Sequence, residues 1–443
     1  MSILAACGSP TTSSDGANAV TTSTSGAEVT TAAETVAPSS EATAATTGSG
    51  TLRIGTGDSG DGLAPHNQII KNYEQEAPGV LVRVEPVAGS DYYTRLLTQL
   101  AAKSAPDLMQ VGDDAVPNFV SKGAFVPLDA YLEQGFDASI YLPGLLEPGQ
   151  YQGKQYLLPK DYSTLGVYYN KKLFDAAGVP VPTSDWTWEQ LLDTAQKMTT
   201  TNADGTPDVY GIQLPGAWTT GFEYWVAAAG GTLISPDGKN YVGFMDSPEV
   251  IRAVQFYADL YRNKLAPLPA DMNAFGGGNS EFDNGKAAMR IFGRWPQASL
   301  KTNPNVELGV VAPPRDKQRA NILFWGGFGI ASTTAAPDQA WNLLSYYTGA
   351  PAAEVWKDWG LPTVKSVADE AGLTNDPIEK VWIGELDHLT PRAYTFTPYW
   401  GDTADPALSK ALQTVIIDPD ADVATVMEQA AQEAQQALDA KQP

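Results

Sequence analysis

Three aspartates stand directly after segments that the hydrophobic pattern predicts as β-strands, where their side chains could bind a ligand. Asp58 follows the alternating segment TLRIGTG, and Asp113 and Asp114 follow PDLMQVG. Carboxylates accept hydrogen bonds, and a parallel α/β sheet binds its ligands beyond the carboxyl ends of its strands. The alternative for Asp113 or Asp114 is a helix N-cap, and one of the pair could cap while the other binds.

Several tryptophans are predicted to lie on loops, where an indole face could stack on a ligand. Trp295 precedes a proline in FGRWPQ, and Trp218 lies in the predicted loop PGAWTTG. Trp325 precedes two glycines in FWGGFGI, where the backbone could approach a ligand closely. Packing in the core is the alternative for each ring, and Trp225 is expected to be part of a helix core.

The composition of the 443 residues excludes several function classes. The formal net charge is -23, from 51 acidic and 28 basic residues, and such a surface repels phosphate backbones, so we expect no nucleic-acid partner. Cys7 is the only cysteine, which rules out an intrachain disulfide. His66 and His388 lie too far apart for metal-ligand spacing, so we expect no structural zinc site. No apolar run is long enough to span a bilayer.

The first fifty residues predict an anchor followed by a tether. Residues 4–8, LAACG, resemble a bacterial lipobox, in which Cys7 is the lipid attachment point. Only six residues precede Cys7, which is shorter than the basic and apolar regions of a signal peptide. Residues 8–50 are almost entirely Ser, Thr, Ala, Gly and Glu, so we expect a disordered tether. A chance cysteine in a disordered N-terminus is the alternative.

The elements that must position the candidate residues follow an α/β pattern. Between residues 51 and 112 the apolar positions predict strand, helix, strand, helix, strand, which favours a parallel sheet. STLGVYYNKKLF predicts a second strand running into a helix. TWEQLLDTAQKMT carries a capping box of Thr187 with Gln190. DSPEVIRAVQFYADLYRN begins with Ser247 as N-cap and Pro248 at the first helical position, and ATVMEQAAQEAQQALDA predicts a C-terminal helix.

The segment YQGKQYLLPKDYSTLGVYYNKKLFDAAGV resembles the bacterial extracellular solute-binding proteins of sugar-type ABC importers, the group that includes maltose-binding protein. Three further segments agree with that family in order along the chain: SAPDLMQVGDDAVPNFVSKGAFVPLDAYL, FDNGKAAMRIFGRWP and FWGGFGIASTTAAPDQAWNLLSYYTGAPAAEVW. The resemblance covers the chain from about residue 51 to its end.

The resemblance implies a two-lobed periplasmic-binding-protein-like α/β fold, with a ligand cleft between lobes that close about a hinge. By analogy the chain crosses between lobes near Asp161, Trp325 and Gly372. The expected parts are a residual signal with lipobox (1–7), a tether (8–50), lobe 1 (51–162 and 327–372) and lobe 2 (163–326 and 373–443).

The family resemblance also implies a carbohydrate as the ligand. A sugar presents an apolar C–H face to an aromatic ring and a rim of hydroxyls to polar groups. Trp295 matches an aromatic of the family, Trp400 in TPYWGDT matches a region that contributes one, and Asp114 resembles the hydroxyl-binding carboxylate. Asp161 lies at the first crossing, and Gly327 adjoins the second. Arg294 could donate to hydroxyls, with an ordinary salt bridge as the alternative.

The resemblance implies no catalysis, no cofactor and no metal, and it implies ABC permease subunits as partners of a monomer anchored at the outer face of the membrane. The loop of Asp113 and Asp114 lacks the tryptophan of maltose-binding protein, which argues against linear maltodextrin. Two other hypotheses stay open. The same fold could bind a polyol, polyamine, peptide or glycerophosphodiester, or the protein could be an extracellular glycoside hydrolase with paired carboxylates.

Overall fold

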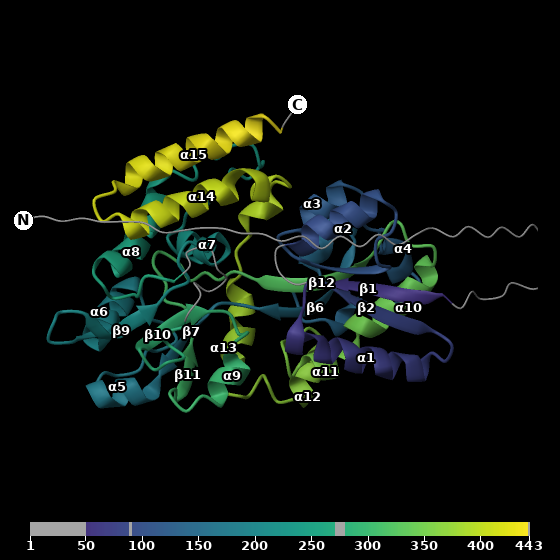
Figure 1. The fold of residues 1–443 in the computed structure, drawn as a ribbon, viewed down its shortest axis with the longest axis horizontal. Coiled ribbons are helices and arrows are strands. Elements are labelled where there is room, and N and C mark those ends of the chain that lie inside the picture. Colours follow the sequence, from purple (N-terminus) through teal and green to yellow (C-terminus); the bar gives the residue numbers. More distant parts are fainter. Residues whose placement is uncertain (1–49, 88–90, 271–279, 442–443) are drawn as a thin grey trace, which may run out of the picture. The chain divides into compact units, whose positions relative to one another are not determined.

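A computed structural model describes residues 50–87, 91–270 and 280–441. Within this part of the chain, two β-sheets each carry their own set of helices, and the strands β6 and β12 run from one set toward the other (Figure 1). Cys7 and almost all of the predicted tether lie outside the described residues, so the predictions for them stay predictions.

The first sheet has six strands in the order β13-β6-β12-β3-β1-β2. Its strands β1, β2 and β3 pair in parallel, as the alternation of strands and helices predicted. The strands β6, β12 and β13 are antiparallel to their neighbours. The bounds of the six strands are Thr51–Thr56 (β1), Leu81–Pro86 (β2), Leu108–Gly112 (β3), Leu157–Ser163 (β6), Phe324–Ile330 (β12) and Leu361–Pro362 (β13).

Helices cover this sheet with their apolar stripes. In α1, for example, Ile69 and Ile70 lie one turn before Tyr73 and all three are buried, in agreement with the predicted helical spacing. A short hairpin of β4 (Gln150–Tyr151) and β5 (Lys154–Gln155) precedes β6. The helices associated with the first sheet are α1 (Leu63–Glu76), α2 (Asp91–Ala101), α3 (Val116–Ser121), α4 (Asp129–Leu132), α10 (Pro337–Thr348), α11 (Ala350–Trp356) and α12 (Lys365–Glu370).

The second sheet has five strands in the order β11-β7-β10-β9-β8. Its central strand β10 is buried at every position, which is typical of a strand covered on both faces. The bounds are Gly166–Asn170 (β7), Thr200–Thr201 (β8), Pro207–Gln213 (β9), Ala287–Phe292 (β10) and Leu308–Val311 (β11).

The helices of the second sheet include the two last helices of the chain, whose alanine-rich faces allow close packing on α8 and on each other. The predicted capping box is confirmed, because Thr187 Oγ1 accepts from Gln190 N and Gln190 Oε1 accepts from Thr187 N. These helices are α5 (Lys171–Ala177), α6 (Trp188–Met198), α7 (Thr219–Ala228), α8 (Pro248–Arg262), α9 (Gln297–Lys301), α13 (Glu379–Gly384), α14 (Trp400–Ile417) and α15 (Val423–Asp439).

The chain passes between the two sheets more than once. β6 belongs to the first sheet and β7 to the second, so the first passage lies between Ser163 and Gly166. The chain returns between Val311 of β11 and Phe324 of β12, and α14 and α15 pack against the core of the second sheet. This is the two-lobed architecture that the resemblance implied, whereas the exact lobe boundaries stay a prediction.

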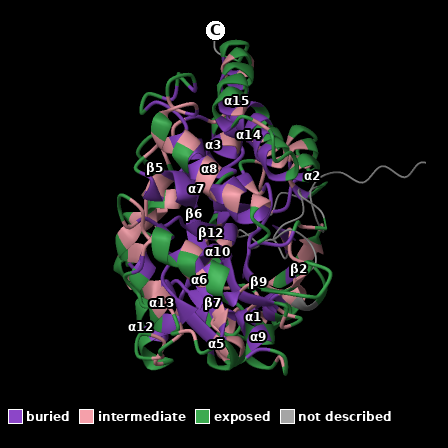
Figure 2. Ribbon diagram, turned by 90° about the vertical axis from the view of Figure 1, so that its left-hand side faces the viewer, coloured by how far each residue is buried: buried purple, intermediate pink, exposed green. Residues whose placement is uncertain are grey.

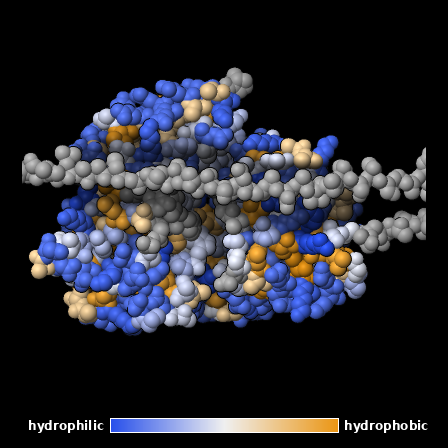
Figure 3. Space-filling model, viewed as in Figure 1, coloured by the Kyte–Doolittle hydropathy of each residue, from blue (hydrophilic) through white to orange (hydrophobic). Residues whose placement is uncertain are grey.

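Burial follows the same plan. Figure 2 shows the strands β6, β7 and β12 largely buried, while the outer turns of the helices are exposed. The face in Figure 3 is predominantly hydrophilic, with hydrophobic residues in separate patches, as expected from the large acidic excess. Within the described residues, no helix combines the length and apolar character that crossing a bilayer requires.

Candidate binding cleft

A cavity of about 520 Å³ opens between the two sheets, where both contribute side chains. This volume falls in the range of about 300–1,000 Å³ that is usual for small-molecule sites. Predicted ligand residues that line it are Asp58, Asp113, Asp114, Asp161, Trp218, Arg294, Trp295 and Trp325. The sequence separation of these residues shows that the fold, and no local motif, assembles the site.

One wall of the cavity is built from Asp58, which follows β1. Asp58 Oδ2 accepts from Lys160 Nζ at 2.9 Å and lies 2.8 Å from His66 Nε2. Although burial alone raises the pKa of Asp58, the charge of Lys160 and the hydrogen bonds from Lys160 and His66 lower it overall. Burial lowers the pKa of His66, so the neutral ring donates its Nε2 proton to a fully ionised carboxylate.

Asp161 lies on β6 beside this group, with its carboxylate 3.5 Å from Lys160 Nζ. Two glycines make room for its side chain. A Cβ added at Gly326 would lie 2.7 Å from Asp161 Oδ1, and one at Gly360 would lie 3.0 Å from Asp161 Cβ. The glycine after Trp325 therefore allows a carboxylate, and not only backbone, to reach the cavity.

The adjacent residues Asp113 and Asp114, which follow β3, differ in their surroundings. Asp113 is buried, and its Oδ1 accepts from Trp325 N at 3.2 Å while its Oδ2 contacts the Tyr394 hydroxyl. Asp114 is exposed on the cavity wall. Asp113 thus has partners within the protein, whereas Asp114 presents its carboxylate to the cavity.

An aromatic cluster forms the wall on the side of the second sheet. Trp218 stacks on Phe324 with ring centroids 5.3 Å apart, and the Trp295 ring meets Phe324 edge-on at 5.0 Å. Trp218 is partly buried, whereas 43% of Trp295 is exposed. Phe324 therefore contacts both indoles, and Trp295 combines this aromatic packing with a large exposed surface on the cavity wall.

The neighbouring Arg294 is tied to the protein. Its Nε and Nη2 donate to the two carboxylate oxygens of Glu379 at 2.7 and 3.1 Å, and its backbone N–H donates to Ser163 Oγ. The ordinary salt bridge considered as the alternative is therefore present. The bidentate pair fixes the loop that carries Trp295.

Three of the predicted ligand residues do not present a side chain to the cavity. The Trp325 ring is buried and its Nε1 donates to Leu145 O at 2.8 Å. Gly327 has no room for a Cβ because that ring lies over it, two positions along the same strand face. Trp400 is the first residue of α14 and is buried beside Tyr241, in the core of the second sheet. The apolar face of α14 takes Trp400 away from the cavity.

Other lining residues were not singled out from the sequence. They include Tyr93, Gln110, Lys160, Thr220, Phe324 and Trp359. Trp359, in KDWGLPT, stands on a turn before a glycine and a proline and is 46% exposed, so the reasoning applied to Trp295 could have found it. Lys160 carries no such signal, because its partner Asp58 lies 102 positions away.

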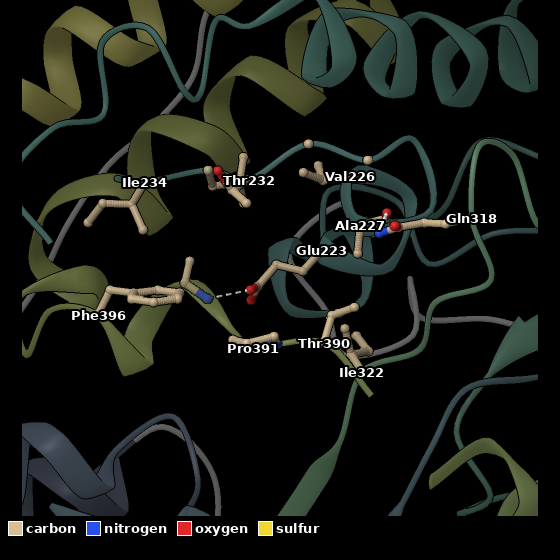
Figure 4. Close-up of a pocket in the computed structure, with 14 residues that line it drawn as sticks. Glu223, Val226, Ala227, Thr232, Ile234, Gln318, Ile322, Thr390, Pro391 and Phe396 are labelled. Atoms are coloured by element: carbon tan, nitrogen blue, oxygen red, sulfur yellow. Dashed lines mark hydrogen bonds between the residues drawn. The ribbon is translucent and has the colours of Figure 1, made fainter. Parts of the chain in front are cut away.

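A smaller cavity of about 230 Å³ lies beside α7. Figure 4 shows Glu223 pointing into it, with a hydrogen bond from the Ala393 amide to Glu223 Oε2. Its other oxygen accepts from Arg392 at 2.7 and 3.0 Å. Since this carboxylate is fully used within the protein and the remaining lining is largely apolar, the cavity of about 520 Å³ is the better candidate of these two for a ligand site.

Comparison with known proteins agrees with this architecture. A model of the family described as bacterial extracellular solute-binding protein matches residues 68–380. The chain belongs to this family. Members of this family are solute-binding proteins located outside the cytoplasm.

Relatives with stated ligands show the range of the family. The maltotriose-binding protein of Pyrococcus abyssi is 26% identical over 74% of this chain and 70% of its own length. The diacetylchitobiose-binding protein DasA of Streptomyces coelicolor is 28% identical over 64% and 66%. A solute-binding protein of Thermotoga lettingae, solved with α-D-tagatose, is 25% identical, covers 88% of this chain and 99% of its own, and superimposes with a TM-score of 0.74.

The arrangement of this solute-binding protein suits hydrogen bonding and stacking. The described residues contain no group of three or more histidine, cysteine, aspartate or glutamate side chains arranged to hold a metal ion. Carboxylates from the first sheet face an indole wall from the second, so a solute between them would contact both lobes.

Proposed function

We propose that this solute-binding protein captures a carbohydrate, a mono- or oligosaccharide, in the cavity between its lobes and delivers it to an ABC importer. The observation that carries the proposal is the pairing of Trp218 and Trp295 on one wall with Asp58, Asp114 and Asp161 on the other. An indole face suits the C–H face of a sugar ring, and carboxylates suit its hydroxyls. The relatives named above, whose stated ligands are sugars, support this substrate class.

Closure of the lobes would bring the two walls onto the sugar and exclude water. No covalent chemistry is required, so we propose a monomeric protein without catalytic activity or cofactor. A bound sugar should be released unchanged after long incubation. Net consumption of the sugar, abolished by Asp114→Asn or Asp161→Asn, would instead support the glycoside hydrolase.

Calorimetric titration with a panel of mono-, di- and oligosaccharides tests the proposal. We expect at least one sugar to bind with a dissociation constant in the micromolar range or below, to quench tryptophan fluorescence and to raise the melting temperature. Absence of heat, quenching and thermal shift with every sugar would overturn it. A polyamine or polyol that binds while all sugars fail would favour the alternative solute class.

We further propose that Cys7 carries lipid and that residues 8–50 tether the body to the outer face of the cell membrane, next to its permease. Acyl chains give stable anchoring when two or more are present. Expressed behind a complete signal peptide, the protein should partition into detergent, and Cys7→Ala should move it to the aqueous phase. Equal partitioning of the two forms would contradict the anchor.

A further inference from the structure

Both basic side chains that line the cavity in the described part of the chain are already neutralised. Lys160 is buried, donates to Asp58 and lies 3.5 Å from the Asp161 carboxylate. Its ammonium also lies 4.7 Å from the centre of the Trp356 ring. Arg294 forms the bidentate pair with Glu379 described above. Neither cation could approach an anionic solute without giving up a carboxylate partner.

The carboxylates of the cavity retain capacity to accept hydrogen bonds. Asp114 is exposed on the cavity wall, and its carboxylate forms no ion pair with any described residue. Asp58 uses Oδ2 for both Lys160 and His66, so Oδ1 can accept from a solute. About a third of the Asp58 and Asp161 side chains is exposed.

A buried hydroxyl on the same wall has no partner among the described residues. Tyr162 lines the cavity from β6, is 4% exposed, and its phenol oxygen makes no hydrogen bond. A neutral hydroxyl can donate and accept, and a buried one without a partner is costly. Among the described residues, the cavity therefore offers carboxylate acceptors and a neutral hydroxyl without a partner, while both of its cations are paired with carboxylates.

We propose that the cavity selects its solute by charge, taking uncharged or positively charged polyhydroxy compounds and rejecting those with a carboxylate or phosphate group. An anion would lose its hydration without gaining a cation, and it would lie beside Asp114 and Asp161. A hydroxyl or ammonium group would instead donate to those carboxylates. This inference rests on the proposed carbohydrate function and narrows it.

Matched sugars that differ in charge test the inference. Glucose, glucuronate and glucosamine form one set, and galactose, galacturonate and galactosamine form another, each titrated by calorimetry at pH 7 and low salt. For any set whose neutral sugar binds, we expect the dissociation constant of the uronate to be at least about tenfold higher. This factor is on the order expected from repulsion between like charges a few ångströms apart in a protein. The amino sugar should bind at least as tightly as the uronate in every set.

Variants assign the effect to the charges named. Asp114→Asn should reduce the neutral-to-uronate preference, since it removes an exposed charge without breaking an ion pair of the protein. Asp58→Asn should reduce the neutral-to-uronate preference further, because it releases Lys160 from its ion pair. Asp193→Asn, an exposed change on α6 with the same loss of charge, should leave it unchanged. Melting curves would identify a variant that fails to fold. If Asp58→Asn fails to fold, Asp114→Asn remains as the test.

The outcomes separate the two proposals. A uronate that binds as tightly as its neutral partner, or more tightly, would overturn selection by charge while leaving the carbohydrate function intact. A preference for neutral sugars that survives both Asp114→Asn and Asp58→Asn would overturn the role of these charges. Failure of every carbohydrate, charged or neutral, would overturn the proposed function itself.

Discussion

At the scale of single residues, the cleft separates side chains that serve the protein from side chains left for a solute. Asp113 and Asp114 are adjacent in sequence, yet the first bonds inside the protein and the second faces the cavity. Among the indoles, Trp325 and Trp400 are buried in the cores, whereas Trp295 keeps 43% of its surface exposed. Burial of the ring, more than residue type, distinguishes a binding platform from a core residue.

Replacing Trp295 by alanine should weaken sugar binding more than it weakens the fold. The exposed indole surface is lost, and stacking with burial of apolar area is worth about 1–3 kcal/mol. We therefore expect the dissociation constant measured by calorimetry to rise about tenfold or more, with a small change in melting temperature.

Trp341→Ala provides the control for this change, because the Trp341 ring stacks on Tyr131 at 4.9 Å on the first lobe and does not line the cavity. It should lower the melting temperature and leave the affinity unchanged. An unaltered affinity after Trp295→Ala would argue that sugar binds elsewhere.

At the scale of elements, buried ion pairs hold the loops that form the site. Glu379, the first residue of α13, accepts from Arg294, from Gln297 Nε2 at 2.6 Å and from Lys301 Nζ at 3.0 Å. One carboxylate thereby joins α13 to α9 and to the loop of Trp295. Although burial alone raises the pKa of Glu379, Arg294 and Lys301 lower it overall.

Glu379→Gln should cost about 3–5 kcal/mol of unfolding free energy at pH 7, because it leaves the Arg294 guanidinium without its counter-charge. A lowered pKa means that the stabilisation is present above about pH 4.5, the ordinary value, and is lost as pH falls through the folded-state value. Urea unfolding at pH 7 and pH 3.5 should thus show a smaller difference between variant and wild type in acid. A difference independent of pH would contradict this assignment.

At the scale of the whole described body, a buried charge network joins the two lobes behind the cavity. Asp113, at the end of β3, contacts the Tyr394 hydroxyl and lies 3.8 Å from Arg392 Nη1. Arg392 in turn donates to Glu223 of α7 and to Leu323 O at 2.9 Å. Burial, opposed by Arg392 and assisted by Asp114, raises the pKa of Asp113 to about 6.

The raised pKa predicts a pH dependence of stability. Between about pH 4 and pH 6 the folded state holds a proton on Asp113 that the unfolded state has released, so the unfolding free energy falls as pH rises through this window. Asp113→Asn removes this slope. The unfolding free energy of the variant, relative to wild type, should rise by about 1–3 kcal/mol between pH 4 and pH 7.

Urea titrations of wild type, Asp113→Asn and the surface control Asp193→Asn at four pH values check this expectation. The control should parallel wild type throughout. A variant curve that runs parallel to wild type from pH 4 to pH 7 would show that Asp113 is ionised in the folded protein across the whole window.

Much of the fold follows from local patterns that the sequence displays. The apolar patterns of TLRIGTG and PDLMQVG predict the parallel strands β1 and β3, and Thr187 with Gln190 begins α6. The position of carboxylates after those strands also follows, because parallel strands end at one edge of the sheet. Trp359 stands on a loop before a glycine and a proline, a local pattern similar to that of Trp295, so it was equally predictable.

Strand positions, helix ends, the acidic surface and the supply of carboxylates and indoles follow from local patterns and composition, because they depend on neighbouring residues. Which of those side chains meet depends on the packing of the whole fold. It paired Lys160 with Asp58, opened a space for Asp161 between Gly326 and Gly360, and buried Trp400 in a core. Such contacts join residues far apart in the chain. Their geometry depends on how both sheets pack and cannot be predicted from any short segment.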